Sequence, residues 1–218
     1  MSADPLSGNH RVTLTTADAK ALGYTVTGVT YDSTLTFSNT TNIFEYTGTP
    51  TPGEYDFRNV AEHELDEALG IGSALTGLAN NAVIPTTTSF AAEDYFRYSA
   101  AATRGITTNP NAVIYFSYDG GATSVAVFNQ NNNAGGNSFA DRNDWVYGNS
   151  GCPAQAPGPF IQDAIGCPNV VIKLTGTSPE VKTLASLGWD LAIPEPGTLL
   201  LAAGAFAAAL LRRCWKHR

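Results

Sequence analysis

The sequence predicts an α+β domain in which a mixed β-sheet packs against one amphipathic helix. Residues 57–68 place apolar side chains at helical spacing, residues 24–44 alternate apolar residues with Thr and Ser, and residues 119–121 read Asp-Gly-Gly between two short apolar runs. A chain of 218 residues can bury the core of one domain and still carry appendages. Charged residues make up only 14% of it, which is typical of β-rich exported proteins.

The N-terminal part is expected to supply most of the sheet. Residues 1–11 are polar and lack the basic and apolar regions of a secretory signal, so we expect this start to lie inside a longer gene product. Residues 16–22 predict a short helix. Residues 24–44 predict half-buried strands that form the sheet beneath the central helix, with these inward-facing side chains: Val26, Val29, Tyr31, Leu35 and Phe37.

The central helix is expected over residues 55–70. At 100° per residue, Phe57, Ala61, Leu65 and Ala68 fall on one narrow arc that can face a core, while Glu62 and Asp66 point to water. Asp56 or Asn59 is the expected N-cap, and Gly70 can adopt the left-handed conformation that ends a helix.

A third face of this helix carries metal-binding chemistry. His63 and Glu67 are four residues apart and stack one turn above the other, the spacing at which a helix offers two ligands to one metal ion. Glu64 lies about 100° round the helix from His63, at the edge of that site.

The second half of the chain predicts a hairpin, a loop and a closing helix. Residues 112–116 and 124–128 read as two strands joined at Asp119-Gly120-Gly121. Residues 129–151 are rich in Asn and Gly and predict a solvated loop; its Asp and Asn oxygens lack the spacing of a calcium loop. Residues 179–187 predict a helix that starts at Pro179.

The motif His63-Glu64-x-x-Glu67-x-x-Gly70 resembles the HExxH signature of zincins, extended in metzincins to HExxHxxGxxH. Glu67 stands where the second histidine belongs, and Ser73 stands where the third ligand belongs. The longer phrase over residues 55–70 is similar to a family of bacterial exported metallopeptidases with PEP-CTERM tails, in which HExxH and HExxE versions occur. The resemblance runs with gaps from Ala17 to Asp190. It implies a zincin-like domain over residues 1–191 whose sheet packs on the active-site helix.

This resemblance also implies the roles of the site residues. Zn²⁺ would be held by His63 and Glu67, and Glu64 would be the catalytic base that takes a proton from a metal-activated water attacking a peptide bond.

The third ligand is expected to be an acid, because the only other histidines are His10 and His217, near the two ends of the chain. Asp94 is the first choice, with Asp163 or Asp141 behind it; otherwise the site is incomplete. The competing interpretation of Asp94 is a turn carboxylate bonded to nearby backbone.

The cysteines differ in context. Cys152 and Cys167 sit in matching Gly-Cys-Pro motifs that bracket a loop, whereas Cys214 lies in the basic tail. We predict a disulfide between the first two, which would contribute roughly 3 kcal/mol in the chain-entropy picture and would indicate an oxidising compartment. The alternative is two unpaired thiols in a surface loop.

The C-terminal residues 192–218 have a different composition. Pro194-Glu195-Pro196 is followed by the uncharged run 198–211 and by the basic end 212–218. This closely resembles a PEP-CTERM sorting signal, also known as an ice-binding-protein C-terminal domain. The run 198–211 predicts a single transmembrane helix whose basic end stays in the cytoplasm. The resemblance implies an exosortase-type transpeptidase as a partner, and a body that is exported and either membrane-anchored or released to the cell surface or extracellular matrix.

The charge balance narrows the function. The net charge is −7, and without the four bases of residues 212–218 and Glu195 the chain holds 8 basic and 18 acidic residues, which argues against nucleic acid as a partner. Two functions remain: an exported zinc-dependent metallopeptidase (a hydrolase) acting on a peptide or protein substrate, or a non-catalytic surface or matrix protein, adhesive or exopolysaccharide-associated, on a degenerate zincin fold. An acidic side chain near His63 and Glu67, with Glu64 facing an open cleft, would favour the first.

Overall fold

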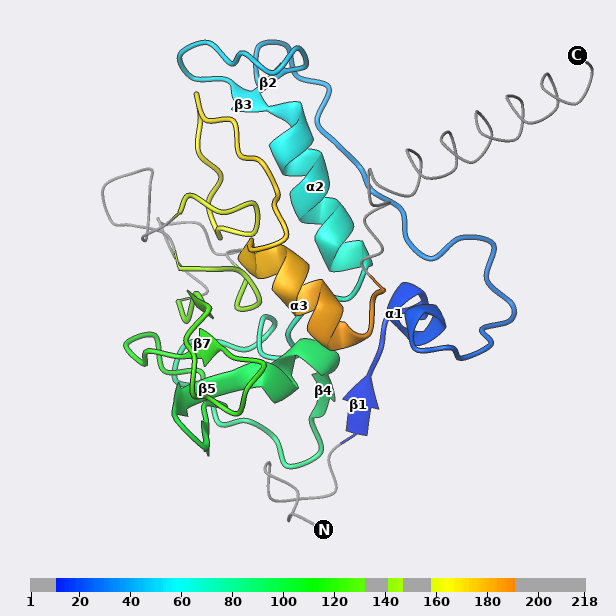
Figure 1. Ribbon diagram of the computed structural model, residues 1–218, viewed down its shortest axis with the longest axis vertical. Coiled ribbons are helices and arrows are strands. Elements are labelled where there is room, and N and C mark those ends of the chain that lie inside the picture. The colour runs from blue at the N-terminus through cyan, green and yellow to red at the C-terminus, as the bar shows by residue number, and fades with distance from the viewer. Residues whose placement is uncertain (1–10, 132–140, 147–157, 191–218) are drawn as a thin grey trace, which may run out of the picture.

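The computed structural model describes residues 11–131, 141–146 and 158–190. Figure 1 shows the elements in space. In chain order they are β1 (Arg11–Thr13), α1 (Thr16–Ala21), β2 (Phe44–Glu45), β3 (Tyr55–Asp56), α2 (Phe57–Ala68), β4 (Ser89–Ala91), the 3-10 helix η1 (Ala92–Phe96), β5 (Arg97–Ala100), β6 (Thr103–Arg104), β7 (Tyr115–Phe116), β8 (Ala126–Val127) and α3 (Pro179–Leu187).

The strands form three small sheets among the described residues. β1 pairs with β4 and β2 pairs with β3, both in parallel, and an antiparallel sheet has the order β6-β5-β7-β8. The predicted single mixed sheet packed on the central helix is therefore wrong. The described fold is a mixed α/β arrangement of short strands and three α-helices.

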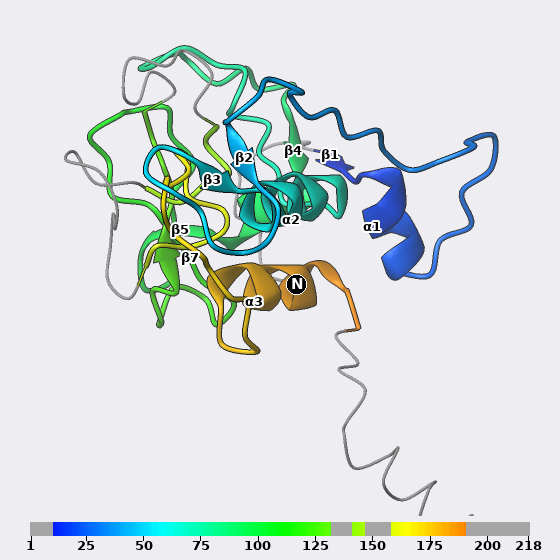
Figure 2. The ribbon, with the colours of Figure 1, turned by 90° about the horizontal axis from the view of Figure 1, so that it is seen from above.

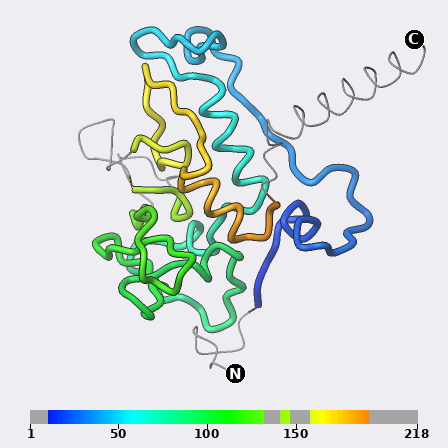
Figure 3. Tube along the Cα trace, viewed as in Figure 1, coloured from blue at the N-terminus to red at the C-terminus, as the bar shows by residue number. Residues whose placement is uncertain are grey.

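The region expected to supply that sheet is a surface loop instead. Residues 24–43 contain no strand and run along one edge of the molecule, as the tube in Figure 3 shows. Tyr31 is 67% exposed and Val29 is 43% exposed. Alternation of Thr with apolar residues matches a strand locally, but a strand forms only where a neighbour accepts its backbone hydrogen bonds, and no such neighbour lies here.

The predicted hairpin is confirmed. β7 and β8 pair antiparallel, with Tyr115 opposite Val127 and Phe116 opposite Ala126. Gly121 has a φ of +88°, and a Cβ atom there would lie 2.6 Å from the Ala100 carbonyl oxygen, so the turn requires glycine at this position.

The helices predicted over residues 16–22, 55–70 and 179–187 are also confirmed, the first two with slightly shorter bounds. Asp56 caps α2, since its Oδ1 accepts a hydrogen bond of 2.9 Å from the Arg58 backbone N–H. Asn59 is not the cap: its side-chain N–H donates to the Val170 carbonyl. Gly70, after the end of α2, has a φ of +119°.

The buried face of α2 differs from the predicted one. Leu65 is 47% exposed, whereas Asp66 is only 4% exposed. At its start the helix packs Phe57 against a group of aromatic rings from the preceding segments: Phe37, Phe44 and Tyr46. The residues that pack on a helix decide which face is covered, and here the covered face carries acids.

Two apolar clusters position the rest of the chain. The larger consists of Ile114, Phe116, Ala126, Phe128, Trp145 and Phe160; in the smaller, Leu184 and Leu187 of α3 pack with Ile71. Residues 158–178 run alongside α2, while α1 lies on the far side of the molecule from β5 and β7 (Figures 1 and 2). Asn59 joins α2 to this segment by accepting a hydrogen bond of 3.2 Å from the Ile172 N–H.

Several predictions fall on residues outside this description. In the part of the chain that is described, no helix is both long enough and apolar enough to cross a bilayer. The predicted helix 198–211 and the tail 192–218 lie outside the described residues, as does Cys152, half of the predicted disulfide.

Candidate metal centre

His63 and Glu67 of α2 meet a third ligand from a distant part of the chain. His63 Nε2 lies 3.9 Å from Glu67 Oε1 and 3.8 Å from Asp144 Oδ1. One potential ligand atom from each residue lies within 4.8 Å of the other two. This group could hold a metal ion.

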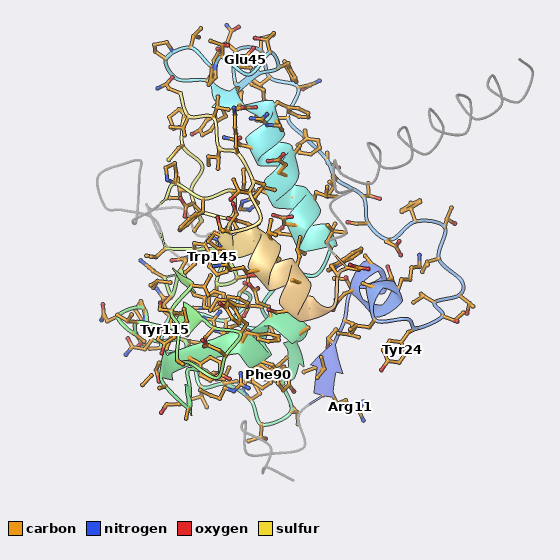
Figure 4. All side chains as sticks on the ribbon, viewed as in Figure 1. Arg11, Tyr24, Glu45, Phe90, Tyr115 and Trp145 are labelled. Atoms are coloured by element: carbon orange, nitrogen blue, oxygen red, sulfur yellow. The ribbon has the colours of Figure 1, made fainter. Side chains whose placement is uncertain are left out.

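Asp144 is brought to α2 by the core. The next residue, Trp145, is fully buried among Phe116, Phe128 and other apolar side chains. Its backbone N–H donates to the Gln162 carbonyl at 2.7 Å, and its indole N–H donates to Glu180 Oε1 at 3.1 Å. Figure 4 shows Trp145 beside the start of α3. Burial of the indole therefore fixes where the Asp144 carboxylate points.

His63 is oriented as a metal ligand. Its Nδ1 lies 3.0 Å from the Ile161 carbonyl oxygen, and because a carbonyl can only accept, Nδ1 must carry the proton. Nε2 then carries the lone pair on the side of Glu67 and Asp144, where the side-chain amide nitrogen of Gln162 also lies 3.4 Å from it. A ring nitrogen held by a backbone carbonyl is the usual support of a histidine that binds metal.

Two amides hold the ligand carboxylates. Asn143 Nδ2 donates to Glu67 Oε1 at 3.1 Å and to Asp144 Oδ1 at 2.9 Å. Gln162 Nε2 donates to the same Asp144 oxygen at 3.1 Å. These donors fix both acids and delocalise part of their negative charge.

The electrostatics favour a bound cation. Burial raises the pKa of Asp144 to about 8, and the carboxylates of Glu67 and Asp141 push it in the same direction. Burial also raises the pKa of Glu67. Burial lowers the pKa of His63, but Asp144, the Ile161 carbonyl and Glu67 outweigh it, so the net shift is upward. Without a cation the group retains protons, and a divalent ion would displace them.

The donor set suits a divalent metal ion. One imidazole nitrogen and two carboxylate oxygens lie within 4.8 Å of one another, and His63 Nε2 lies 3.8 and 3.9 Å from the two acids. Ligand atoms on one tetrahedral ion lie roughly 3.3 Å apart, so the side chains would move closer together on binding an ion.

Asp94, the predicted third ligand, lies elsewhere and has a structural role. It is fully buried; its Oδ1 accepts from Ser73 Oγ at 2.5 Å, and its Oδ2 accepts from the backbone N–H groups of Ala74 and Ala91 at 2.9 and 3.1 Å. This is the competing interpretation, a carboxylate bonded to nearby backbone. The structure thus places Asp144 with His63 and Glu67, and not Asp94.

Asp141 and Asp163, the other two candidates for the third ligand, also lie outside the metal-binding group. Asp141 is near enough for Glu67 to lower its pKa through a hydrogen bond, although burial raises that pKa overall. Asp163 is buried, and its Oδ2 accepts from the Phe160 N–H at 3.0 Å. Asp144 was not predicted as a ligand, because residues 129–151 were predicted to be a solvated loop. The residue that could have indicated a buried segment is Trp145, since a large apolar side chain is rarely exposed in a solvated loop.

A cleft opens beside the metal-binding group. It has a volume of about 180 Å³ and lies between α2 and residues 160–172, with both His63 and Glu64 in its lining. His63 and Glu64 thus share one cleft, whereas neither Glu67 nor Asp144 is among its described lining residues.

No family model, no curated protein and no solved structure matches this chain significantly. The chemistry of the site is therefore argued from its own geometry.

Proposed function

We propose that this protein is a zinc-dependent hydrolase of peptide bonds, with His63, Glu67 and Asp144 as metal ligands and Glu64 as the general base. One observation carries the proposal: three side chains that can bind a metal converge, and one of them, His63, lines a cleft together with Glu64. An acidic helix with only a chance His-Glu pair would not need a buried third acid at the same point.

Zinc is preferred to calcium or magnesium because of the imidazole ligand. Calcium and magnesium select oxygen ligands in larger number, whereas imidazole with carboxylate suits zinc. Bound zinc would supply a Lewis acid that polarises the scissile carbonyl and activates water for attack. Two carboxylates in place of imidazoles weaken that Lewis acidity, and the amide donors of Asn143 and Gln162 offset part of the added charge.

The chain's own residues would move the proton. Glu64 accepts a proton from the attacking water and returns it to the leaving amine. His63 stays oriented because its Nδ1–H donates to the Ile161 carbonyl, which leaves Nε2 for the metal.

We also propose that the protein works outside the cytoplasm on peptide or protein substrates, with residues 192–218 recognised by an exosortase-type transpeptidase. Support comes from the sequence alone: the Pro-Glu-Pro motif with its basic end, and the matching contexts of Cys152 and Cys167. Mass spectrometry of the mature protein from its host would test both the processing of residues 192–218 and the cysteine pairing.

The catalytic proposal is tested with Glu64→Gln and, as a matched control on the same helix, Glu62→Gln. Both variants should bind one zinc per chain. Glu64→Gln should lose hydrolysis of a mixed peptide library by at least about 100-fold, because general-base catalysis contributes roughly that much or more. Glu62→Gln should stay within about threefold of the natural protein, because Glu62 does not line the cleft.

Two results would contradict the proposal. One is full activity in zinc-loaded Glu64→Gln. The other is stoichiometric zinc with no hydrolysis of any library peptide by the natural protein, which would favour the non-catalytic surface role.

A further inference from the structure

The cleft beside His63 and Glu64 has apolar walls and an acidic lining. Its apolar side chains come from both sides: Tyr55, Val60, Phe160, Ile161, Ala164 and Ile172. Three lining residues are acids, Asp56, Glu64 and Asp163, and among the described residues His63 is the only basic side chain in the lining. A cleft of this kind attracts a ligand that is apolar along its length and positive at its end.

The three acids are not equivalent. Asp56 is already engaged, since it caps α2 and its Oδ2 pairs with Arg58 Nη2 at 3.2 Å. Glu64 stands at the edge of the metal-binding group, where the proposed reaction needs it. Asp163 is the acid left for the ligand.

Only one of the two carboxylate oxygens of Asp163 accepts a hydrogen bond among the described residues. Its side chain is only 3% exposed, and its Oδ2 accepts from the Phe160 N–H at 3.0 Å. Its Oδ1 is buried without a hydrogen-bond partner among the described residues. A buried carboxylate oxygen left unpaired is costly, and a cationic donor is the partner that compensates it best.

We propose that this cleft accepts a lysine or arginine side chain of the peptide substrate, with Asp163 pairing with its cationic end. This specificity rests on the proposed function, because it places the basic side chain next to the bond that Glu64 and the metal would act on.

The dimensions and surroundings agree with a single side chain. Pockets for small-molecule ligands hold roughly 300–1,000 Å³, so a cleft of about 180 Å³ suits one residue better than a free cofactor. A metal ion is a poor alternative occupant, because the only described group of three metal-ligating side chains is His63, Glu67 and Asp144. Burial raises the pKa of Asp163 to about 7 and Glu180 adds to the shift, although the Phe160 N–H and His63 act against it.

The test uses the full-length, zinc-loaded protein and two probes that differ only in charge. Nα-acetyl-lysine methylamide and its norleucine analogue are titrated calorimetrically against the natural protein, Asp163→Asn and the control Asp190→Asn. The substitution at Asp163 keeps an acceptor for the Phe160 N–H, and Asp190 is an exposed acid outside the cleft. We expect the lysine probe to bind at least about tenfold more tightly than the norleucine probe, and Asp163→Asn alone to lose that preference.

Hydrolysis of a peptide series with Lys, Arg, norleucine or Glu at one varied position gives an independent readout. Cleavage preferring Lys or Arg, with the preference lost in Asp163→Asn, supports the inference. Equal binding of the two probes to the natural protein overturns it, whether or not Asp163→Asn folds, and so does an undiminished preference in folded Asp163→Asn. Hydrolysis without preference contradicts the inference alone, whereas selective binding of the lysine probe without hydrolysis of any peptide contradicts the proposed catalytic function alone.

Discussion

Asp144 Oδ1 lies 3.8 Å from His63 Nε2, although the two residues come from distant segments of the chain. Two contacts bring these residues together. Trp145, next to Asp144 in the chain, is buried in the larger apolar cluster, and the backbone carbonyl of Ile161 accepts a hydrogen bond from His63 Nδ1. The packing of the apolar core therefore also determines the arrangement of the metal-binding group. Predictions about metal affinity, pH and individual substitutions follow from this arrangement.

Zinc affinity should increase with pH up to about 8. The metal needs deprotonated ligands, and the raised pKa values of His63 and Glu67, with that of Asp144 at about 8, mean that protons compete below that pH. For each proton displaced, the association constant should rise roughly tenfold per pH unit between pH 6 and 8. Competition titrations with a zinc indicator at several pH values measure this. A constant affinity across that range would contradict the assigned ligands.

The metal-free protein should be less stable at pH 8 than at pH 5. Burial raises the pKa of Asp18 to about 6, of Asp66 and Asp163 to about 7, and of Asp144 to about 8. A carboxyl whose pKa is higher in the folded state contributes stability that is fully present below the unfolded pKa near 4 and is lost as pH rises through the folded pKa.

Thermal unfolding in the presence of a chelator should therefore show a midpoint at least about 5 °C lower at pH 8. Zinc added at pH 8 should restore much of the difference, because binding to the folded state alone stabilises it. A metal-free protein that is more stable at pH 8 than at pH 5 would be inconsistent with buried, proton-retaining acids.

Asn143→Ala should weaken zinc binding by about 10- to 100-fold without removing a ligand. The amide holds Glu67 and Asp144 together, and loss of such supporting donors typically has an effect of that size. Thr76→Val is the control, since it removes the hydrogen bond of 3.1 Å to Asn143 Oδ1 and the one of 3.0 Å from the Arg142 N–H, but no contact with the acids. Equal losses in both variants would point to general loosening of the fold and not to a specific role for the amide.

Asp94→Asn should lower stability and leave zinc binding intact. The amide oxygen can still accept from the N–H groups of Ala74 and Ala91, but the NH2 group then replaces the acceptor of the Ser73 hydroxyl, and the negative charge near Arg97 is lost. We therefore expect a loss of about 1–3 kcal/mol in the free energy of unfolding. Urea unfolding together with zinc analysis checks both expectations. If folded Asp94→Asn lost its zinc, Asp94 would have to be a metal ligand, which would contradict this expectation.

Local signals in the sequence predicted local structure correctly. Of the two predicted caps of α2 the structure has Asp56, and the Gly70 stop, the start of α3 at Pro179 and the hairpin around Gly120 and Gly121 are confirmed. These features depend on a few adjacent residues whose conformational preferences are strong. His63 and Glu67 were predicted for the same reason, because helical spacing alone places them on one face.

Features that depend on distant partners were not predictable in this way. The alternation in residues 24–44 fits a strand, but whether a strand forms depends on a pairing neighbour that the local pattern does not encode. The same applies to α2, where Leu65 is exposed and Asp66 is buried because of what packs on the helix. Asp144 was missed for a related reason: a carboxylate becomes a ligand through the tertiary contacts of Trp145, and nothing near it in the sequence specifies His63 as its neighbour.

The proposed metal centre is tested most directly by measuring the zinc content per chain. Elemental analysis after dialysis would compare the natural protein with Asp144→Asn and Asp94→Asn. We predict close to one zinc in the natural protein and in Asp94→Asn, and almost none in Asp144→Asn while its circular dichroism spectrum stays native. Full zinc content in Asp144→Asn, or no zinc in the natural protein, would contradict the proposed metal centre.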